Sequence, residues 1–351
     1  MKKTLFSLLL VYITAVIVVI ASCSKPYNDS HTVTVSPSYT INQLFAGLRT
    51  SPQTLTVTAG RDTIVYGANG TRMHFYTNSF KTAAGAIITS GTINLQLVEM
   101  YKPGDMIANR ATTMANGRIL QSGGQVNIIA TMNGETVYAN KYGIAFKHGT
   151  TSSAPMALFY GATANADSIA TWAQADTSMV GTVASGANID TLGSGGGGGS
   201  SYAPVFNFDT CTNFTWANCD WFYDNDSPKT TVSVILPDTT FNPGNTQLFL
   251  VLPNVNRWGI TTDTFNAVMS NDGGYGSTGY NAATRTLSIL SEGNTTIVPA
   301  GLKYELVAIT NKGGKYYYWQ TSGVVPHNGL NLNAALAPDT ESDILARLSG
   351  L

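Results

Sequence analysis

A short stretch of the chain brings three acidic residues close to three aromatic residues whose rings carry a polar N–H or O–H group. The acids are Asp220, Asp224 and Asp226, and the rings belong to Trp216, Trp221 and Tyr223. Paired carboxylates carry out acid–base catalysis in glycosidases, carboxylate oxygens bind calcium, and aromatic rings offer an apolar face to a ligand. Because a complete calcium-loop pattern is absent, the sequence favours an Asx-rich turn with the rings in the core. A sugar-binding surface, or a calcium site at Asp224 and Asp226, is the alternative.

A second group of rings runs from Tyr316 to Trp319. In a strand, successive side chains point to opposite faces, so Tyr317 and Trp319 share one face. One of the two faces must belong to the core. The other is either an exposed contact stripe or covered by a neighbouring element, which makes Tyr317 and Trp319 candidate ligand contacts.

Residues suited to nucleophilic catalysis are scarce. A triad needs a serine or cysteine beside a histidine that a carboxylate orients, and the chain has only 4 histidines. No Gly-x-Ser-x-Gly elbow is present. The sequence therefore predicts no catalytic residue, no cofactor and a structural or binding role. A carbohydrate-binding or adhesin module is the first alternative, and a glycosidase or peptidase is the second.

Cys23 ends an N-terminal segment with the order of an export signal. Two lysines precede an apolar run from Leu5 to Ile20, and two small residues come directly before the cysteine. This order is typical of a lipoprotein signal peptide at residues 1–22, after which the Cys23 thiol carries acyl chains. More than one chain gives stable anchoring. The alternative is an uncleaved transmembrane helix, for which the run is near the lower limit of about 17 residues.

The predicted anchor also indicates compartment and partners. Ser24 follows the cysteine where an Asp would signal inner-membrane retention, so we expect an outer-membrane lipoprotein, facing either the periplasm or the cell surface. Removal of residues 1–22 takes away two lysines and no acids, which makes the formal net charge of −1 more negative by two. A mildly acidic protein gives no reason to expect a nucleic-acid partner. The expected partners are the membrane, through the lipid, and a glycan or another envelope protein.

Cys211 and Cys219 are the other two of the 3 cysteines. An even pair in an exported protein favours a disulfide, which would add about 2.5 kcal/mol by closing so short a loop. Two reduced, buried thiols are the alternative. A zinc site is not expected, because no histidine lies nearby in the sequence.

Composition and periodicity predict a mainly β protein. Charged residues make up 11% of the chain, far below the usual quarter, and uncharged polar residues take their place. Period-2 alternation at 54–58 and 93–98, with a hairpin turn at Asn133-Gly134, predicts antiparallel β-sandwich-like domains. The Gly/Ser-rich stretch at 193–202 has the composition of a flexible linker.

The expected organisation has five parts. These are a signal peptide at 1–22, a polar tether at 23–50, a first sandwich-like domain at 51–192, the Gly/Ser linker at 193–202 and a second sandwich-like domain at 203–351. Within this scheme we expect a helical turn near residues 42–48 in the tether and a short C-terminal helix near 342–348.

Two stretches carry more specific motifs. The first includes residues 91–100, 104–109 and 122–128, and the second is the heptapeptide Trp216–Phe222. Both resemble an uncharacterised group of Bacteroidota cell-envelope lipoproteins, the heptapeptide through a Trp-x-Asn-Cys-Asp-x-Phe motif. Trp221 stands where the group often has Arg. The resemblance implies an exported, lipid-anchored β protein and carries no known activity.

Overall fold

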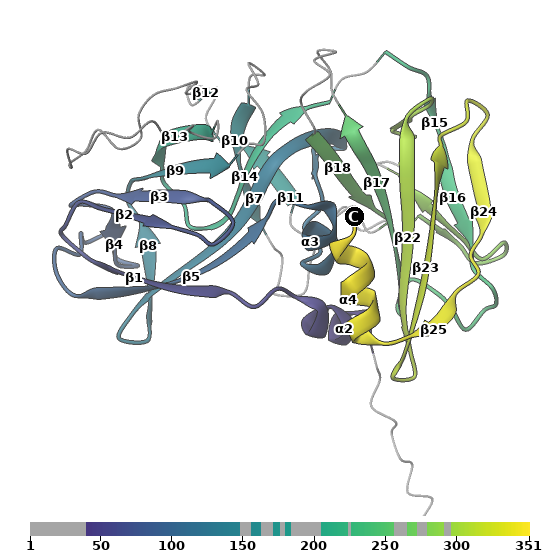
Figure 1. The fold of residues 1–351 in the computed structure, drawn as a ribbon, viewed down its shortest axis with the longest axis horizontal. Helices are drawn as coiled ribbons and strands as arrows, with labels where there is room; N and C mark the ends of the chain where they lie inside the picture. Colours follow the sequence, from purple (N-terminus) through teal and green to yellow (C-terminus); the bar gives the residue numbers. More distant parts are fainter. Residues whose placement is uncertain are drawn as a thin grey trace, which may run out of the picture. The chain divides into compact units, whose positions relative to one another are not determined.

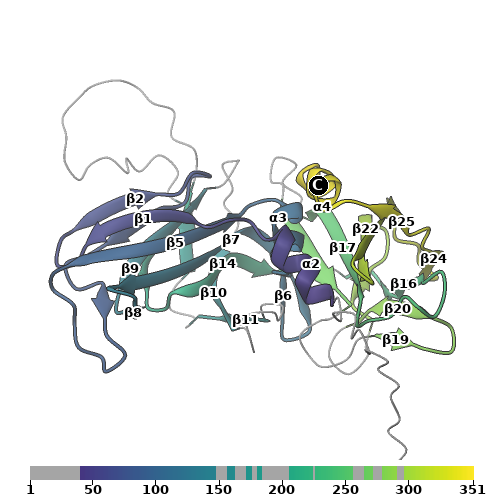
Figure 2. The same ribbon diagram turned by 90° about the horizontal axis from the view of Figure 1, so that it is seen from below.

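Strands make up most of the structure, a computed structural model (Figures 1 and 2). It describes residues 40–147, 156–162, 171–175, 180–183, 205–223, 226–255, 265–271, 279–290 and 296–351. Cys23 and the Gly/Ser stretch lie outside these ranges. All strand pairs in the described residues are antiparallel except one, β16 with β24.

The first sandwich has two sheets. One contains β1 (Gln53–Thr58), β5 (Thr92–Met100), β7 (Arg118–Met132), β14 (Thr215–Phe222), β10 (Met156–Ala162) and β11 (Thr171–Gln174), in this order. The other contains β2 (Thr63–Tyr66), β3 (Arg72–Phe75), β9 (Tyr142–Lys147), β13 (Val205–Cys211) and β12 (Val180–Val183). Three shorter strands complete the pairing. β6 (Met114–Ala115) and β8 (Glu135–Ala139) pair with β7, and β4 (Phe80–Lys81) pairs with β8.

The core of this sandwich follows from the period-2 pattern. Leu95 on β5 and Ile128 on β7 point inward and are fully buried, as are the neighbours two residues away along each strand. The rings of Phe75 and Tyr142 come from the other sheet and stack with centroids 5.8 Å apart. Apolar burial from both sheets stabilises the sandwich.

The second sandwich also has two sheets. One contains β25 (Ala337–Asp339), β23 (Lys315–Val324), β22 (Lys303–Lys312), β17 (Thr246–Val255) and β18 (Phe265–Ser270). The other contains β19 (Tyr280–Asn281), β20 (Thr286–Ile289), β16 (Val232–Ile235) and β24 (Leu330–Asn333). A small ladder joins β15 (Lys229–Thr230) to β21 (Val298–Pro299).

Three helices cover the outer face of the sheet that contains β17 and β22 (Figure 1). They are α2 (Ile41–Leu48), α3 (Pro103–Ala108) and α4 (Glu341–Ser349). On β17, Leu250 points into the sandwich while Phe249 and Val251 point to the helices. Both faces are therefore buried, which explains the nearly continuous apolar run of this strand.

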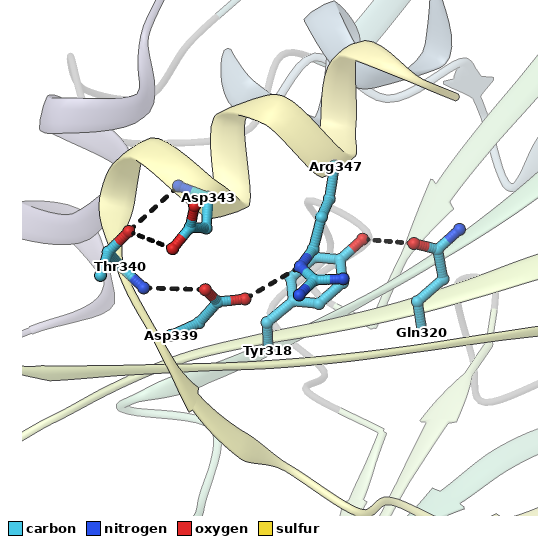
Figure 3. A network of polar contacts seen from close by, with 6 residues as sticks. All are labelled: Tyr318, Gln320, Asp339, Thr340, Asp343 and Arg347. Atoms are coloured by element: carbon cyan, nitrogen blue, oxygen red, sulfur yellow. Dashed lines mark hydrogen bonds and ion pairs between the residues drawn. The ribbon is translucent and has the colours of Figure 1, made fainter.

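A polar network fixes α4 on β23 (Figure 3). Thr340 caps the helix by accepting a hydrogen bond from the Asp343 amide at 3.1 Å. Arg347 Nε donates to Asp339 Oδ2 at 3.0 Å, and its guanidinium lies 5.5 Å from the Tyr318 ring centroid. Burial raises the pKa of Tyr318 to about 12, and its hydroxyl donates to Gln320. The ring face of Tyr318 is therefore covered by Arg347 of α4.

The mainly β, antiparallel, sandwich-like architecture and the short C-terminal helix confirm the expected fold class. The strand pairing differs from the division expected at residues 193–202. Strands β13 and β14 come after that stretch but pair with β9, β7 and β10, which come before it. The stretch therefore lies between two strands of the first sandwich. The strands of the second sandwich begin at β15, and one of them, β18, also pairs with β7 of the first.

The expected tether also ends earlier than residue 50. Residues 41–48 form α2, whose four apolar side chains are buried in the helix-covered core. The predicted helical turn at 42–48 is confirmed as a full amphipathic helix. The described residues from 40 to 351 belong to one compact unit.

Candidate functional site

The outer surface of the first sheet carries an exposed group of side chains without charge. The inward apolar residues of β1, β5, β7 and β8 are buried or half-buried, so the alternating residues point outward. We call the following set the uncharged face: Thr54, Thr56, Thr58, Thr92, Asn94, Gln96, Ile129, Thr131, Thr136 and Tyr138. Nine of these residues are exposed and Thr131 is half-buried.

Strand register arranges the uncharged face in rows across β1, β5, β7 and β8. Gln96 lies between Thr54 and Ile129. Thr56, Asn94, Thr131 and Thr136 form the next row, and Thr58 pairs with Thr92. These rows put amide and hydroxyl groups side by side on a rigid sheet.

Two large apolar side chains are exposed within the uncharged face. Ile129 is 43% exposed and Tyr138 is 45% exposed. Half-buried Lys81 on β4 pairs with Tyr138 and marks the edge of the face. Inside that edge, the face offers hydrogen-bonding groups and apolar surface with no carboxylate, ammonium, guanidinium or imidazole.

Trp216 lies on the same side of this sheet as the uncharged face, but nearer to the second sandwich. The row there consists of Val98, Asn127, Trp216, Gly161 and Trp172. Trp216 is half-buried, with its ring edge-on to buried Trp172 at 6.3 Å. A Cβ on Gly161 would lie 2.6 Å from Trp216 Cβ, so glycine is required for this packing. Trp216 is thus the one predicted ring candidate that borders the uncharged face.

The other four ring candidates pack inside the protein. Tyr223 is 7% exposed, and the half-buried rings of Trp221 and Trp319 contact the main core. Tyr317 packs edge-on against Phe241 with centroids 5.4 Å apart. The expected contact stripe at 316–319 is therefore covered on both faces, by core residues on one side and α4 on the other.

Of the three predicted acids, the two that the structure describes, Asp220 and Asp226, do not lie at one surface. Asp220 is fully buried on β14, Asp226 is exposed, and Asp224 lies outside the described residues. Burial raises the pKa of Asp220 well above its ordinary value, and hydrogen bonds from Ser122 and Asn218 oppose this shift. The Asp220 Oδ1 atom has no hydrogen-bond partner. Within the described ranges, no three His, Cys, Asp or Glu side chains are grouped so as to hold a metal ion.

The raised pKa of Asp220 predicts a pH dependence of stability. The native state keeps a proton that the unfolded chain releases above its ordinary pKa near 4, so stability falls as pH rises above that value. Asp220→Asn removes this proton linkage. In urea unfolding, we expect the free energy of unfolding of the variant to rise relative to that of the wild type by up to about 1.4 kcal/mol per pH unit. Asp226→Asn is the exposed control, and parallel pH profiles of Asp220→Asn and wild type would contradict the assignment.

The predicted disulfide is not formed. Cys211 and Cys219 are free, buried thiols. They lie on strands of different sheets, Cys211 opposite Tyr142 and Cys219 opposite Leu158. Burial raises the pKa of the Cys211 thiol to about 12, and it also raises that of Cys219.

Sequence reasoning missed two features near the first sheet. The uncharged face follows from the same alternation that predicted the core, because every second residue of those strands must point outward. The second feature is Glu99, which is 2% exposed although charged. No local pattern marks Glu99, since its hydrogen-bond donors come from residues 28 to 46 positions away.

No helix among the residues that the structure places is both long and apolar enough to span a bilayer. A comparison of the sequence with models of known protein families and with curated proteins found no match.

Proposed function

We propose that this protein is a lipid-anchored, non-catalytic binding component of the cell envelope, tethered to the outer membrane through Cys23. The uncharged face is its contact surface in this proposal. The observation that carries it is the exposure of Ile129 and Tyr138 among side chains without charge. Surfaces that become buried in complexes are depleted in charge and enriched in aromatic residues, because an unpaired charge is costly to remove from water.

Anchoring is tested by Cys23→Ala. Without the thiol no acyl chain can attach, and we expect the membrane-bound share of the protein to fall at least about tenfold. Membrane fractionation and immunoblotting measure this share. Ser24→Ala is the control, because it keeps the acylation site and should stay in the membrane. Undiminished retention of Cys23→Ala at full length would support the transmembrane-helix alternative and contradict lipidation.

The contact surface is tested by Ile129→Lys. A lysine at position 129 of the uncharged face must be desolvated when a partner covers the face, so we expect binding of the purified protein to isolated cell envelopes to fall about tenfold or more. Val324→Lys is the matched control, since Val324 is 57% exposed on β23 of the second sandwich. Equal binding of the two variants, measured by co-sedimentation, would remove the uncharged face as the contact surface.

A further inference from the structure

We propose that the uncharged face binds an uncharged polysaccharide, a ligand class that rests on the binding role proposed above. Sugar hydroxyls both donate and accept hydrogen bonds. The side chains of Asn94 and Gln96 each carry a donor and an acceptor, and the six threonine hydroxyls of the face do so as well. A neutral chain therefore finds matching groups across several rows of the sheet.

Charge complementarity selects the neutral class. An anionic polymer or an anionic membrane surface needs clustered Lys or Arg, and none of the ten side chains of the uncharged face carries a positive charge. A cationic partner finds no carboxylate there either. Lys81 stands at the edge and is half-buried.

Rings and dimensions fit an extended chain. Tyr138 offers an apolar ring with a polar tip, a combination that suits the C–H and hydroxyl surfaces of a sugar. Half-buried Trp216, which also packs against the helix-covered core, borders the face beside the row of Gln96 and Ile129. The stretch Thr92–Val98 of β5 is about 20 Å long, and the three strand spacings from β1 to β8 add about 15 Å of width. Because the strands beneath are packed on the core, binding requires little ordering of the protein.

Affinity electrophoresis of the full-length protein in gels containing dextran, pullulan, mannan or laminarin tests this proposal. We expect at least one of these neutral polysaccharides to retard the protein, with affinity unchanged between about 50 and 500 mM NaCl because no charged contact is involved. The double variant N94A/Q96A should weaken binding about tenfold, since two hydrogen-bonding amides are lost. Tyr138→Ala should weaken it about fivefold.

The control variant is N331A/N333A. Asn331 and Asn333 are exposed two residues apart on β24 of the second sandwich and so match Asn94 and Gln96 in type and spacing. All substituted positions are exposed, so stability should change by no more than about 0.5 kcal/mol, which thermal unfolding checks. Any of three results overturns the proposal. Either no neutral polysaccharide retards the protein, or only dextran sulfate or alginate retards it, or both double variants are retarded equally.

The polysaccharide assignment and the proposed contact surface can fail independently of each other. If neutral polysaccharides fail while Ile129→Lys still abolishes envelope binding, the face contacts another class of partner, such as a protein, and the polysaccharide assignment is wrong. If Ile129→Lys binds envelopes like Val324→Lys, the contact surface itself is wrong.

Discussion

Glu99→Ala is expected to lower the free energy of unfolding by about 4 kcal/mol. The Glu99 carboxylate accepts hydrogen bonds from the Thr71 amide at 2.8 Å, the Asn69 amide at 2.8 Å and Gln53 Nε2 at 2.7 Å. It joins β5 of one sheet to the turn between β2 and β3 of the other. Alanine leaves the buried Thr71 amide without an acceptor, and an unsatisfied buried donor costs more than the bond contributes.

Urea unfolding measures this loss. Glu135→Ala is the matched control, because Glu135 is an exposed glutamate at the start of β8, and it should change stability by less than about 0.5 kcal/mol. Glu99→Gln keeps one acceptor oxygen and should fall between the two. A single hydrogen bond contributes about 1 kcal/mol to stability. If the free energy of unfolding of Glu99→Ala lies within about 1 kcal/mol of the wild-type value, the role given to Glu99 is contradicted.

Gly104→Ala is expected to displace α4 and to lower the free energy of unfolding by about 3 kcal/mol. A Cβ on Gly104 in α3 would lie 1.8 Å from the backbone oxygen of Leu348 in α4. The clash is with main chain, so no side-chain rotation relieves it and one helix must move. Displacement of α4 exposes Ile344 and Leu348, which are buried in the native fold.

Hydrogen exchange of the α4 amides, with urea unfolding, measures the displacement. Gly350→Ala is the control, because Gly350 ends the same helix with φ −85° and its Cβ would come no closer than 3.4 Å to the Arg347 oxygen. Similar exchange rates in the two variants would show that close approach of the two helices does not require Gly104.

Local signals predicted the strands and turns well. The Asn133-Gly134 turn joins β7 to β8 with positive φ values of 52° and 85°, as a type I′ turn requires. Alternation also placed Ile93, Leu95 and Leu97 in the core, where all three are fully buried. Such features depend on neighbouring residues only, and the sequence contains them directly.

Long-range pairing explains the differences. Composition suggested a boundary at residues 193–202, but nothing local shows that β14 completes the sheet of β7 and β10. The spacing of Ile41, Leu44, Phe45 and Leu48 did predict a helical turn, but no local pattern shows that these side chains are buried against β17 and β22 rather than lying in a tether.

The same limit applies to the candidate site. Alternation shows that Tyr317 and Trp319 share a face but not that core residues cover it. Asp220 looks like an accessible acid in the sequence and is fully buried in the structure. Exposure of Ile129 and Tyr138 depends on what the rest of the chain leaves uncovered, which only the tertiary structure shows.

Chemical labelling of tyrosines in intact envelopes tests the contact surface most directly. Tyr138 on the uncharged face is 45% exposed, and Tyr66 on β2 of the other sheet is 55% exposed. Iodination followed by peptide mass spectrometry should modify both residues in the purified protein. In the envelope, a covered face predicts that Tyr138 is protected while Tyr66 is still modified. Equal modification of Tyr138 and Tyr66 in the envelope would contradict a binding role for the uncharged face.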